Sequence, residues 1–294
     1  MADAAAAAAA ASADVAAAAA DDDYCPQPPA PYDVLSLAGT TVLLTGASAG
    51  IGEALAWRLA AEGCRLVLVA RRLARLDRLA AALRARHPAL EVATAAADLS
   101  DPRQAEALVP DGLPAGFREI DILINNAGLA LGVASVAEND LGDARTVLET
   151  NVASVVALTR SSARGMLARA PRPGHLVFLS SVAGHEPYAG GSVYCASKAA
   201  VEAFAASARH DLVASAVRVA TVSPGAVNTD FSTTRFGGDR TKADAVYAGF
   251  DPLVAADVAD QVCWCLTRPL RVQVTDVRVL AGSQCSAKGI HRRE

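Results

Sequence analysis

The sequence predicts an α/β protein in which helices cover both faces of one parallel sheet. From about residue 40 onward, short runs of leucine and β-branched residues alternate with stretches of helical periodicity. A glycine-rich turn at 45–52 (TGASAGIG) directly follows the first of these runs. With 52% apolar residues, the chain can bury a large core. We therefore expect a doubly wound α/β fold with a ligand site at the carboxyl ends of its strands.

The first strand is expected at 41–44, with a helix opening near Ile51. Glycines 46, 50 and 52 allow a tight turn and a close approach of the backbone to a ligand. The free N–H groups and positive dipole at the start of the helix favour a phosphate group. A packing turn without a ligand is the alternative.

The second strand, expected at 66–70, ends in Arg71 and Arg72. In a dinucleotide-binding fold this strand end faces the adenosine ribose, where an acidic residue binds the 2′-hydroxyl of NAD and an arginine accommodates the extra phosphate of NADP. Two arginines without an acid favour NADP. Ordinary solvated charge is the alternative, because Arg75 and Arg78 continue a basic helix face.

The third strand is expected to end near Asp98, which also precedes a Ser-Asp-Pro helix start and so suits a capping role. The fourth strand, expected at 121–124, leads into the turn Asn-Asn-Ala-Gly at 125–128. A long helix is expected at 141–169. It contains Asn151, an asparagine in a mildly unfavourable helical position.

The fifth strand, expected at 175–179, leads into Ser180 and Ser181, and a helix after it carries Tyr194 and Lys198. Residues four apart share a helix face, so the ammonium lies beside the phenol. A tyrosine that acts as a base near neutral pH needs its pKa lowered by roughly three units, or roughly 4 kcal/mol. Taken alone, the pair equally fits a tyrosine packed along a lysine stem.

The sixth strand, expected at 217–222, ends in Ser-Pro-Gly at 223–225. The segment 232–249 contains Gly237-Gly238 and mixed charge, which is typical of a mobile lid. A last helix at 255–267 and a last strand at about 274–279 complete the predicted elements.

In this order, the glycine-rich turn, the Asn-Asn-Ala-Gly turn, Asn151, the Ser181/Tyr194/Lys198 set and Pro224-Gly225 resemble the short-chain dehydrogenase/reductase family. The likeness covers about 38–294. It implies a single-domain Rossmann fold, a doubly wound parallel seven-stranded sheet of order 3-2-1-4-5-6-7 with helices on both faces.

The resemblance also implies the site. Its catalytic residues would be Ser181, Tyr194, Lys198 and Asn151, with Ser180 as the other candidate serine. Ser181 would bind the developing oxyanion, Tyr194 would transfer the proton, Lys198 would lower the tyrosine pKa and hold the nicotinamide ribose, and Asn151 would hold a water. The cofactor is NADP, and its expected binding residues are Gly46, Ser48, Gly50, Ile51, Gly52, Arg71, Arg72, Asp98, Leu99, Asn125, Ala127, Gly128, Tyr194, Lys198, Pro224, Gly225, Val227 and Thr229. No metal site is expected.

Three short segments, 128–132 (GLALG), 187–191 (PYAGG) and 235–239 (RFGGD), resemble the NADP-dependent 3-hydroxy acid dehydrogenase branch. That branch implies serine, L-allo-threonine or related 3-hydroxy acids, or the matching semialdehydes and 3-keto acids, as substrates. A carboxylate needs a cationic partner, for which Arg235, Arg240 and Lys242 are candidates, with ordinary solvated loop charge as the commoner explanation for each. The alternatives are a reductase of uncharged ketones or α-dicarbonyls and a non-catalytic NADP(H)-sensing regulator.

Charge distribution separates the first residues from the rest. Residues 1–33 contain six aspartates and no lysine or arginine, which leaves 27 basic and 25 acidic residues elsewhere. This near balance argues against a nucleic-acid partner, and no run in the rest of the chain is apolar enough for a bilayer. We expect a disordered tail at 1–36 and the catalytic domain at 37–294. The tail lacks the features of a secretory or mitochondrial leader.

The six cysteines contain no Cys-x-x-Cys, so reduced thiols in a cytoplasmic protein are expected. The family resemblance implies a homotetramer, or a homodimer, built through the long crossover helices. The small residues Ala199, Ala200, Ala203 and Ala206 would allow close helix approach, although a buried face within one subunit gives the same pattern.

Overall fold

The computed structural model describes residues 32–293. The tail expected at 1–36 therefore falls outside the described residues, apart from 32–36. Within that remainder, the amide of Leu35 donates a hydrogen bond to the carbonyl oxygen of Thr267 at 2.8 Å.

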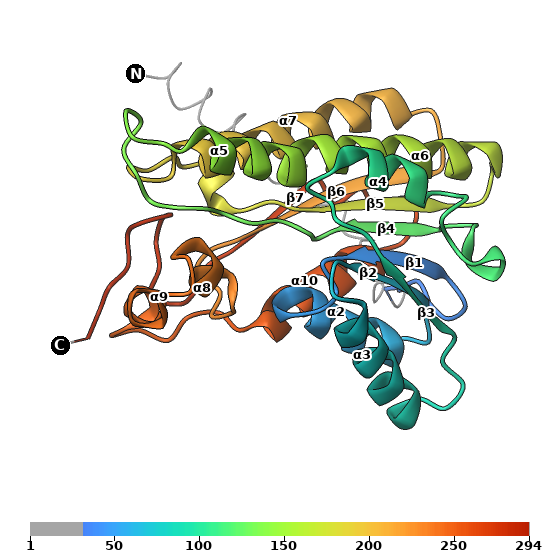
Figure 1. Ribbon diagram of the computed structural model, residues 1–294. Coiled ribbons are helices and arrows are strands. Elements are labelled where there is room, and N and C mark those ends of the chain that lie inside the picture. Colours follow the sequence, from blue (N-terminus) through green and yellow to red (C-terminus); the bar gives the residue numbers. More distant parts are fainter. Residues whose placement is uncertain (1–31, 294) are drawn as a thin grey trace, which may run out of the picture. The chain divides into compact units, whose positions relative to one another are not determined.

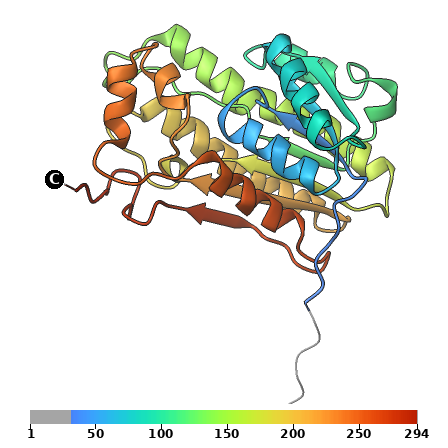
Figure 2. The same ribbon diagram turned by 90° about the horizontal axis from the view of Figure 1, so that it is seen from below.

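One parallel sheet of seven strands forms the centre of the fold, in the order β3-β2-β1-β4-β5-β6-β7. Its strands are β1 (Thr41–Thr45), β2 (Arg65–Ala70), β3 (Val92–Ala96), β4 (Ile122–Asn125), β5 (Gly174–Leu179), β6 (Val217–Pro224) and β7 (Asp276–Val279). The predicted fold class and strand order are confirmed. Figure 2 shows β7, in red, at one edge of the sheet.

Helices pack against both faces of the sheet (Figure 1). The longer ones are α2 (Gly50–Ala61), α3 (Leu73–Arg86), α5 (Leu141–Leu148), α6 (Ser154–Ala168), α7 (Ser192–Leu212) and α10 (Ala255–Leu266). The shorter ones are α4 (Pro102–Leu108), η2 (Ala115–Phe117), η3 (Glu149–Ala153), η4 (Val182–Gly184), α8 (Phe231–Arg235) and α9 (Arg240–Tyr247). Helices α2, α3 and α10 lie on one face, and α4 to α7 lie on the other.

The side chains of each strand alternate between the two faces of the sheet, which produces one hydrophobic core on each face. In β1, Val42 and Leu44 belong to the core under α2, α3 and α10, whereas Leu43 belongs to the core under α4, α6 and α7. Successive side chains of a strand point to opposite faces, so a strand covered on both faces is apolar at most of its positions. This explains why the strands read as continuous apolar runs rather than as alternating ones.

The parallel strands all end at the same edge of the sheet, and the residues expected at the site follow those ends. The expected helix at 141–169 is interrupted by η3, a π-helix that contains Asn151. Within 32–293, no helix combines the length and apolarity needed to cross a membrane. The five cysteines in this range are unpaired.

Candidate active site

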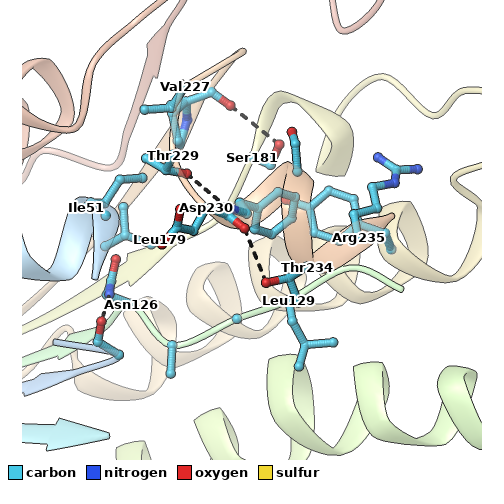
Figure 3. Close-up of a pocket in the computed structure, with 18 of the residues that line it drawn as sticks. Ile51, Asn126, Leu129, Leu179, Ser181, Val227, Thr229, Asp230, Thr234 and Arg235 are labelled. Carbon is cyan, nitrogen blue, oxygen red and sulfur yellow. Dashed lines mark hydrogen bonds between the residues drawn. The ribbon is translucent and has the colours of Figure 1, made fainter. Parts of the chain in front are cut away.

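A cavity of about 500 Å³ lies at the carboxyl ends of the strands. Its walls come from the turn after β1, the ends of β2 and β3, the turn after β4, the segment after β5, α7 and the long loop after β6. Figure 3 shows Ile51, Asn126, Ser181, Thr229 and Arg235 around this space. Residues far apart in sequence therefore meet in one place because the parallel strands deliver them to the same edge.

The glycine-rich turn is shaped for a close approach to a ligand. Gly46 and Gly50 have φ angles of 67° and 58°, which residues with a Cβ adopt reluctantly. A Cβ on Gly52 would collide with the carbonyl oxygen of Gly46 and lie 2.7 Å from the Asn126 amide nitrogen. Helix α2 begins at Gly50 without a side-chain cap, and Gly50, Ile51 and Gly52 of its first turn line the cavity, where its N–H groups would be available to an anion.

Arg71 and Arg72 form a basic wall at the end of β2. Arg72 donates a hydrogen bond to the Ser48 hydroxyl at 3.2 Å, so this residue of the glycine-rich turn is tied to the arginine. Both arginines lie on the cavity, as does Ser48. Partial burial lowers the Arg72 pKa, and the charges of Arg75 and Arg71 add to this effect. Concentrated positive charge of this kind favours an anionic group.

Asp98 lines the cavity next to buried Leu99, yet its carboxylate already has partners. The Ser100 amide and hydroxyl donate to it at 3.0 and 2.8 Å. The hydrogen bond from the Ser100 amide is the main cause of a lowered Asp98 pKa, and the Arg71 charge contributes. Asp98 therefore closes a turn ahead of α4, whose N-cap is Asp101.

Two neighbouring asparagines at the end of β4 have side chains with different partners. Asn125 points away from the cavity and donates to the Thr159 hydroxyl at 3.2 Å. Asn126, which the sequence reasoning did not select, lines the cavity and donates to the Thr45 carbonyl oxygen at 2.8 Å. Residues 127 and 128 follow it along the cavity wall. Strand alternation accounts for this, since adjacent residues face opposite sides.

Tyr194 and Lys198 lie one turn apart on α7, and both line the cavity with Ser181. The Lys198 ammonium lies 6.0 Å from the Tyr194 ring centroid and donates to the Leu179 carbonyl oxygen at 2.7 Å. Ser180 also lies on the cavity wall, but its hydroxyl donates to the Lys198 carbonyl oxygen at 3.4 Å. The Ser181 hydroxyl accepts from the Ala183 amide at 3.1 Å and donates to the Pro224 carbonyl oxygen at 3.4 Å, and it opposes the rise in the Tyr194 pKa. The geometry thus distinguishes the two serines.

The pKa values in this group are set mainly by burial. Removal from water raises the Tyr194 pKa well above its ordinary 10, and the Ser181 hydrogen bond and the Arg235 charge oppose this rise. Burial lowers the Lys198 pKa to about 8. In the protein without cofactor, desolvation outweighs the positive charge of Arg235. A lowered Tyr194 pKa caused by Lys198 together with the bound dinucleotide stays a prediction.

Asn151 lies off the cavity, in the π-helix behind its wall. Its amide nitrogen donates to the Leu129 carbonyl oxygen at 2.8 Å and to the Ser197 hydroxyl at 3.0 Å, while its oxygen accepts from the Leu129 amide at 2.9 Å. A Cβ on Gly128 would lie 3.3 Å from the Asn151 oxygen and 3.4 Å from the Lys198 nitrogen. Asn151 therefore fixes the backbone beside Lys198.

The loop after β6 forms the opposite wall. Pro224, Gly225, Val227 and Thr229 all line the cavity. A Cβ on Gly225 would collide with the side-chain oxygen of Gln284, which accepts from the Ala226 amide at 3.0 Å. The C-terminal segment thus supports this loop directly.

Of the three candidate cations for a substrate acid, only Arg235 lies on the cavity among the described residues. Its guanidinium donates to the Tyr188 hydroxyl at 2.9 Å and the Gly190 carbonyl oxygen at 2.9 Å, and lies 5.9 Å from the Tyr194 ring centroid. Arg240 and Lys242 are exposed and away from the cavity.

Sequence reasoning missed Tyr188, Lys288 and Arg292, which also line the cavity. Tyr188 lies inside a segment that the sequence singled out, so its aromatic ring close to the catalytic helix was a usable signal. Lys288 and Arg292 come from an irregular C-terminal stretch with no motif. Only the folded chain brings them to the site.

A second polar cluster lies outside the cavity, behind the segment that carries Ser181. The imidazole of His185 lies 3.1 Å from the Glu202 carboxylate, and the Ser223 hydroxyl donates to that carboxylate at 2.7 Å. Asp276 of β7 completes it, 3.9 Å from His185. These contacts fix the segment after Ser181 against α7, β6 and β7.

Comparison with known proteins agrees with this geometry. The family described as short chain dehydrogenase matches residues 40–239. An NADP-dependent 3-hydroxy acid dehydrogenase of Schizosaccharomyces pombe is 37% identical over 88% of this chain and 98% of that protein. Sulfoacetaldehyde reductase 2 of Chromohalobacter salexigens is 40% identical over 83% of this chain and 94% of that protein.

Among solved structures, the closed form of a serine dehydrogenase complexed with NADP⁺ superposes with a TM-score of 0.78. It shares 37% sequence identity and covers 86% of this chain and 100% of that one.

Proposed function

The chain belongs to the short-chain dehydrogenase/reductase family, and we propose that it is an NADP(H)-dependent oxidoreductase that interconverts a hydroxyl and a carbonyl group on small 3-hydroxy acids. One observation carries this proposal. Ser181, Tyr194 and Lys198 lie on the same cavity as the glycine-rich turn and the Arg71/Arg72 wall. A proton-transfer group and a dinucleotide site in one cavity are what hydride transfer to a carbonyl requires.

The residues present fit NADP. The close approach of Gly52 to the Gly46 carbonyl and the start of α2 suits the pyrophosphate, and Arg71 and Arg72 suit the 2′-phosphate. Lys198, Pro224, Gly225 and Thr229 would hold the nicotinamide half. The bound cofactor supplies or accepts the hydride.

The chain itself handles the proton and the oxyanion. Ser181 donates a hydrogen bond to the substrate oxygen, and Tyr194, kept protonated by its raised pKa, donates the proton during reduction. In the oxidation direction Tyr194 accepts that proton, which needs added positive charge near the phenol. Asn151 keeps the backbone at Gly128 and Leu129 in place beside the Lys198 ammonium.

Arg235 supports an acid as the substrate. Its guanidinium is held on three sides by Tyr188, Gly190 and Gly132 and lies close to Tyr194. A fixed cation near the proton donor suits a small molecule whose anionic group lies one or two bonds from the reacting carbon. The named relatives agree with this chemistry, since a 3-hydroxy acid and sulfoacetaldehyde both carry an anion close to the reacting group.

The deciding experiment is a substrate panel assayed with NADP⁺ or NADPH and with NAD⁺ or NADH. We expect a higher kcat/KM with NADP(H) than with NAD(H), and turnover of 3-hydroxypropanoate, L-serine, L-allo-threonine or isethionate, or of the matching aldehydes and 3-keto acids. Faster turnover of diacetyl or other uncharged ketones would instead identify a general carbonyl reductase. Tight NADPH binding without turnover of any compound would identify a regulator.

We also propose assembly into a homotetramer, or a homodimer, and a cytoplasmic location. Ala199, Ala203 and Ala206 form an exposed stripe along α7, and exposed apolar residues lie on α5 and α6 at Leu148 and Val156. Exposed apolar patches of this kind favour contact with another subunit. Light scattering of the purified chain gives its mass, and a monomer at micromolar concentration would contradict this assembly.

A further inference from the structure

The C-terminal segment 281–293 folds back onto the cavity. Gln284, which is buried, accepts from the Ala226 amide and donates to the Ser286 carbonyl oxygen at 3.0 Å. The Ala287 amide donates to the Glu186 carboxylate at 2.8 Å. On the other side of Lys288, the Gly289 amide donates to the Ser286 hydroxyl at 2.7 Å. The backbone of Lys288 is therefore held in place at the cavity wall.

Lys288 directs its ammonium to the face of Tyr188, 4.4 Å from the ring centroid. Among the described residues its nitrogen makes no hydrogen bond and no ion pair. The same tyrosine accepts the hydrogen bond from Arg235, whose guanidinium lies near Tyr194. Two cations therefore flank Tyr188, and one of them lacks an acceptor.

No carboxylate balances these cations on the described wall of the cavity. Its two carboxylates are Asp98 and Asp230, which act on Arg71 and Arg72 respectively. Partial burial lowers the Lys288 pKa, and the charges of Arg235 and Arg292 lower it further. A bound anion would relieve this repulsion, whereas a second ammonium would add to it.

Resting on the proposed function, we infer that Lys288 is a specificity-determining residue that binds the acid group of the substrate together with Arg235, and that the site selects fully anionic 3-hydroxy acids over zwitterionic amino acids. A carboxylate or sulfonate lies against both cations. The α-ammonium of serine would enter the same positive field without a carboxylate partner.

Matched substrates and matched variants test this inference. The substrates are 3-hydroxypropanoate, its uncharged amide 3-hydroxypropanamide, and L-serine. The variants are Lys288→Met, which keeps the stem over Tyr188, Lys288→Arg, which keeps the charge, and Lys242→Met, a control at an exposed lysine paired with Asp239. We expect wild type to prefer 3-hydroxypropanoate to both other compounds.

The loss of one charge-assisted hydrogen bond should lower kcat/KM of Lys288→Met for 3-hydroxypropanoate by about 10- to 100-fold, mostly through KM. Activity with the amide should stay unchanged, the preference over L-serine should shrink, and Lys288→Arg should recover most of the loss. Lys242→Met should match wild type. An equal loss for acid and amide, or an unchanged preference over serine, would overturn the inference.

A binding experiment separates this inference from the proposed function. Malonate, a small dianion, should raise the melting temperature of the NADPH-bound wild-type protein and of Lys288→Arg, but raise it less for Lys288→Met, with malonamide as the uncharged control. If malonate has this effect while no hydroxy acid is turned over, the anion site is supported and the proposed activity is refuted. If hydroxy acids are turned over but Lys288→Met responds to malonate like wild type, the role of Lys288 falls.

Discussion

The ammonium of Lys198 donates a hydrogen bond to the carbonyl oxygen of Leu179 at 2.7 Å, at the end of β5. This bond ties α7 to the strand that delivers Ser181, so the phenol on the same helix is held against that serine. Lys198 is 5% exposed, and burial lowers its pKa to about 8. The lysine thus has a structural part in placing α7, the helix that carries Tyr194.

Tyr194→Phe should reduce turnover by about 10²- to 10⁴-fold, the usual contribution of general acid–base catalysis. The ring and its contact with Phe231 are kept, so the fold should not change. NADPH binding, followed by nicotinamide fluorescence, should stay close to wild type. Tyr188→Phe gives a comparison: it removes the hydroxyl that accepts from Arg235, so its effect should fall on KM for the acid rather than on kcat. Near-normal turnover in Tyr194→Phe would remove the mechanism.

Replacement of Arg71 by Asp together with Arg72 by Ala should shift cofactor preference toward NAD. The change removes two positive charges from the cavity wall and supplies a carboxylate for a ribose hydroxyl. The loss of one or two charge-assisted contacts should raise KM for NADP by about 10- to 100-fold. Steady-state kinetics with NADP and with NAD measure both the rise in KM and the change in preference. The control Arg75→Ala, on the exposed side of α3, should keep the wild-type preference for NADP over NAD. An unchanged preference for NADP in the double variant would refute the assignment of Arg71 and Arg72 to the 2′-phosphate.

Gly52→Ala should destabilise the protein by about 1–3 kcal/mol, because its new methyl group overlaps the Gly46 carbonyl and crowds the Asn126 amide. NADPH affinity should fall with it. Gly165→Ala, at an exposed position of α6, has nothing within 4 Å of the new methyl group and should stabilise the protein by up to about 1 kcal/mol. Urea unfolding gives the change in the free energy of unfolding for each variant. Equal changes for Gly52→Ala and Gly165→Ala would contradict the close approach of Gly52 to the Gly46 carbonyl.

His175 on β5 predicts a specific loss of stability in acid. The residue is 4% exposed, both its ring nitrogens lack partners among the described residues, and burial followed by the Arg218 charge lowers its pKa from 6.5 to about 3. Between pH 3 and 6.5 the unfolded chain therefore binds one more proton than the folded chain, so stability rises with pH over this window and is complete above it.

Between pH 7 and pH 5, this histidine should cost wild type about 2 kcal/mol that His175→Leu does not lose. Urea unfolding at pH 7, 6 and 5 gives the difference. His210→Gln, at an exposed position, should keep the wild-type slope. Parallel slopes for wild type and His175→Leu would show that the imidazole does not titrate on unfolding.

The sheet and the part of the cavity wall that carries the motifs could be predicted because local sequence encodes them. Strands buried on both faces read as apolar runs, so each predicted strand falls within a few residues of an observed one. The tyrosine and lysine of α7 meet because helical spacing alone places them on one face. The two arginines reach the cavity because strand β2 ends there.

What could not be predicted depends on side-chain direction and on long-range folding. Asn125 and Asn126 are equivalent as letters, and only the pleat of β4 sends one to Thr159 and the other to the cavity. The rise in the Tyr194 pKa depends on burial, which spacing cannot report. Lys288 arrives through an irregular segment held by Gln284 and Glu186, a placement that no local pattern encodes.

The amide of Asn126 has a mechanical consequence. It donates to the carbonyl oxygens of both Thr45 and Gly46, and so joins the exits of the first and fourth strands. The turns after β1 and β4 are thereby linked through one side chain, which opposes their separate movement. We expect any opening that admits and releases small molecules to arise instead in the walls farther out, around α8 and the C-terminal segment.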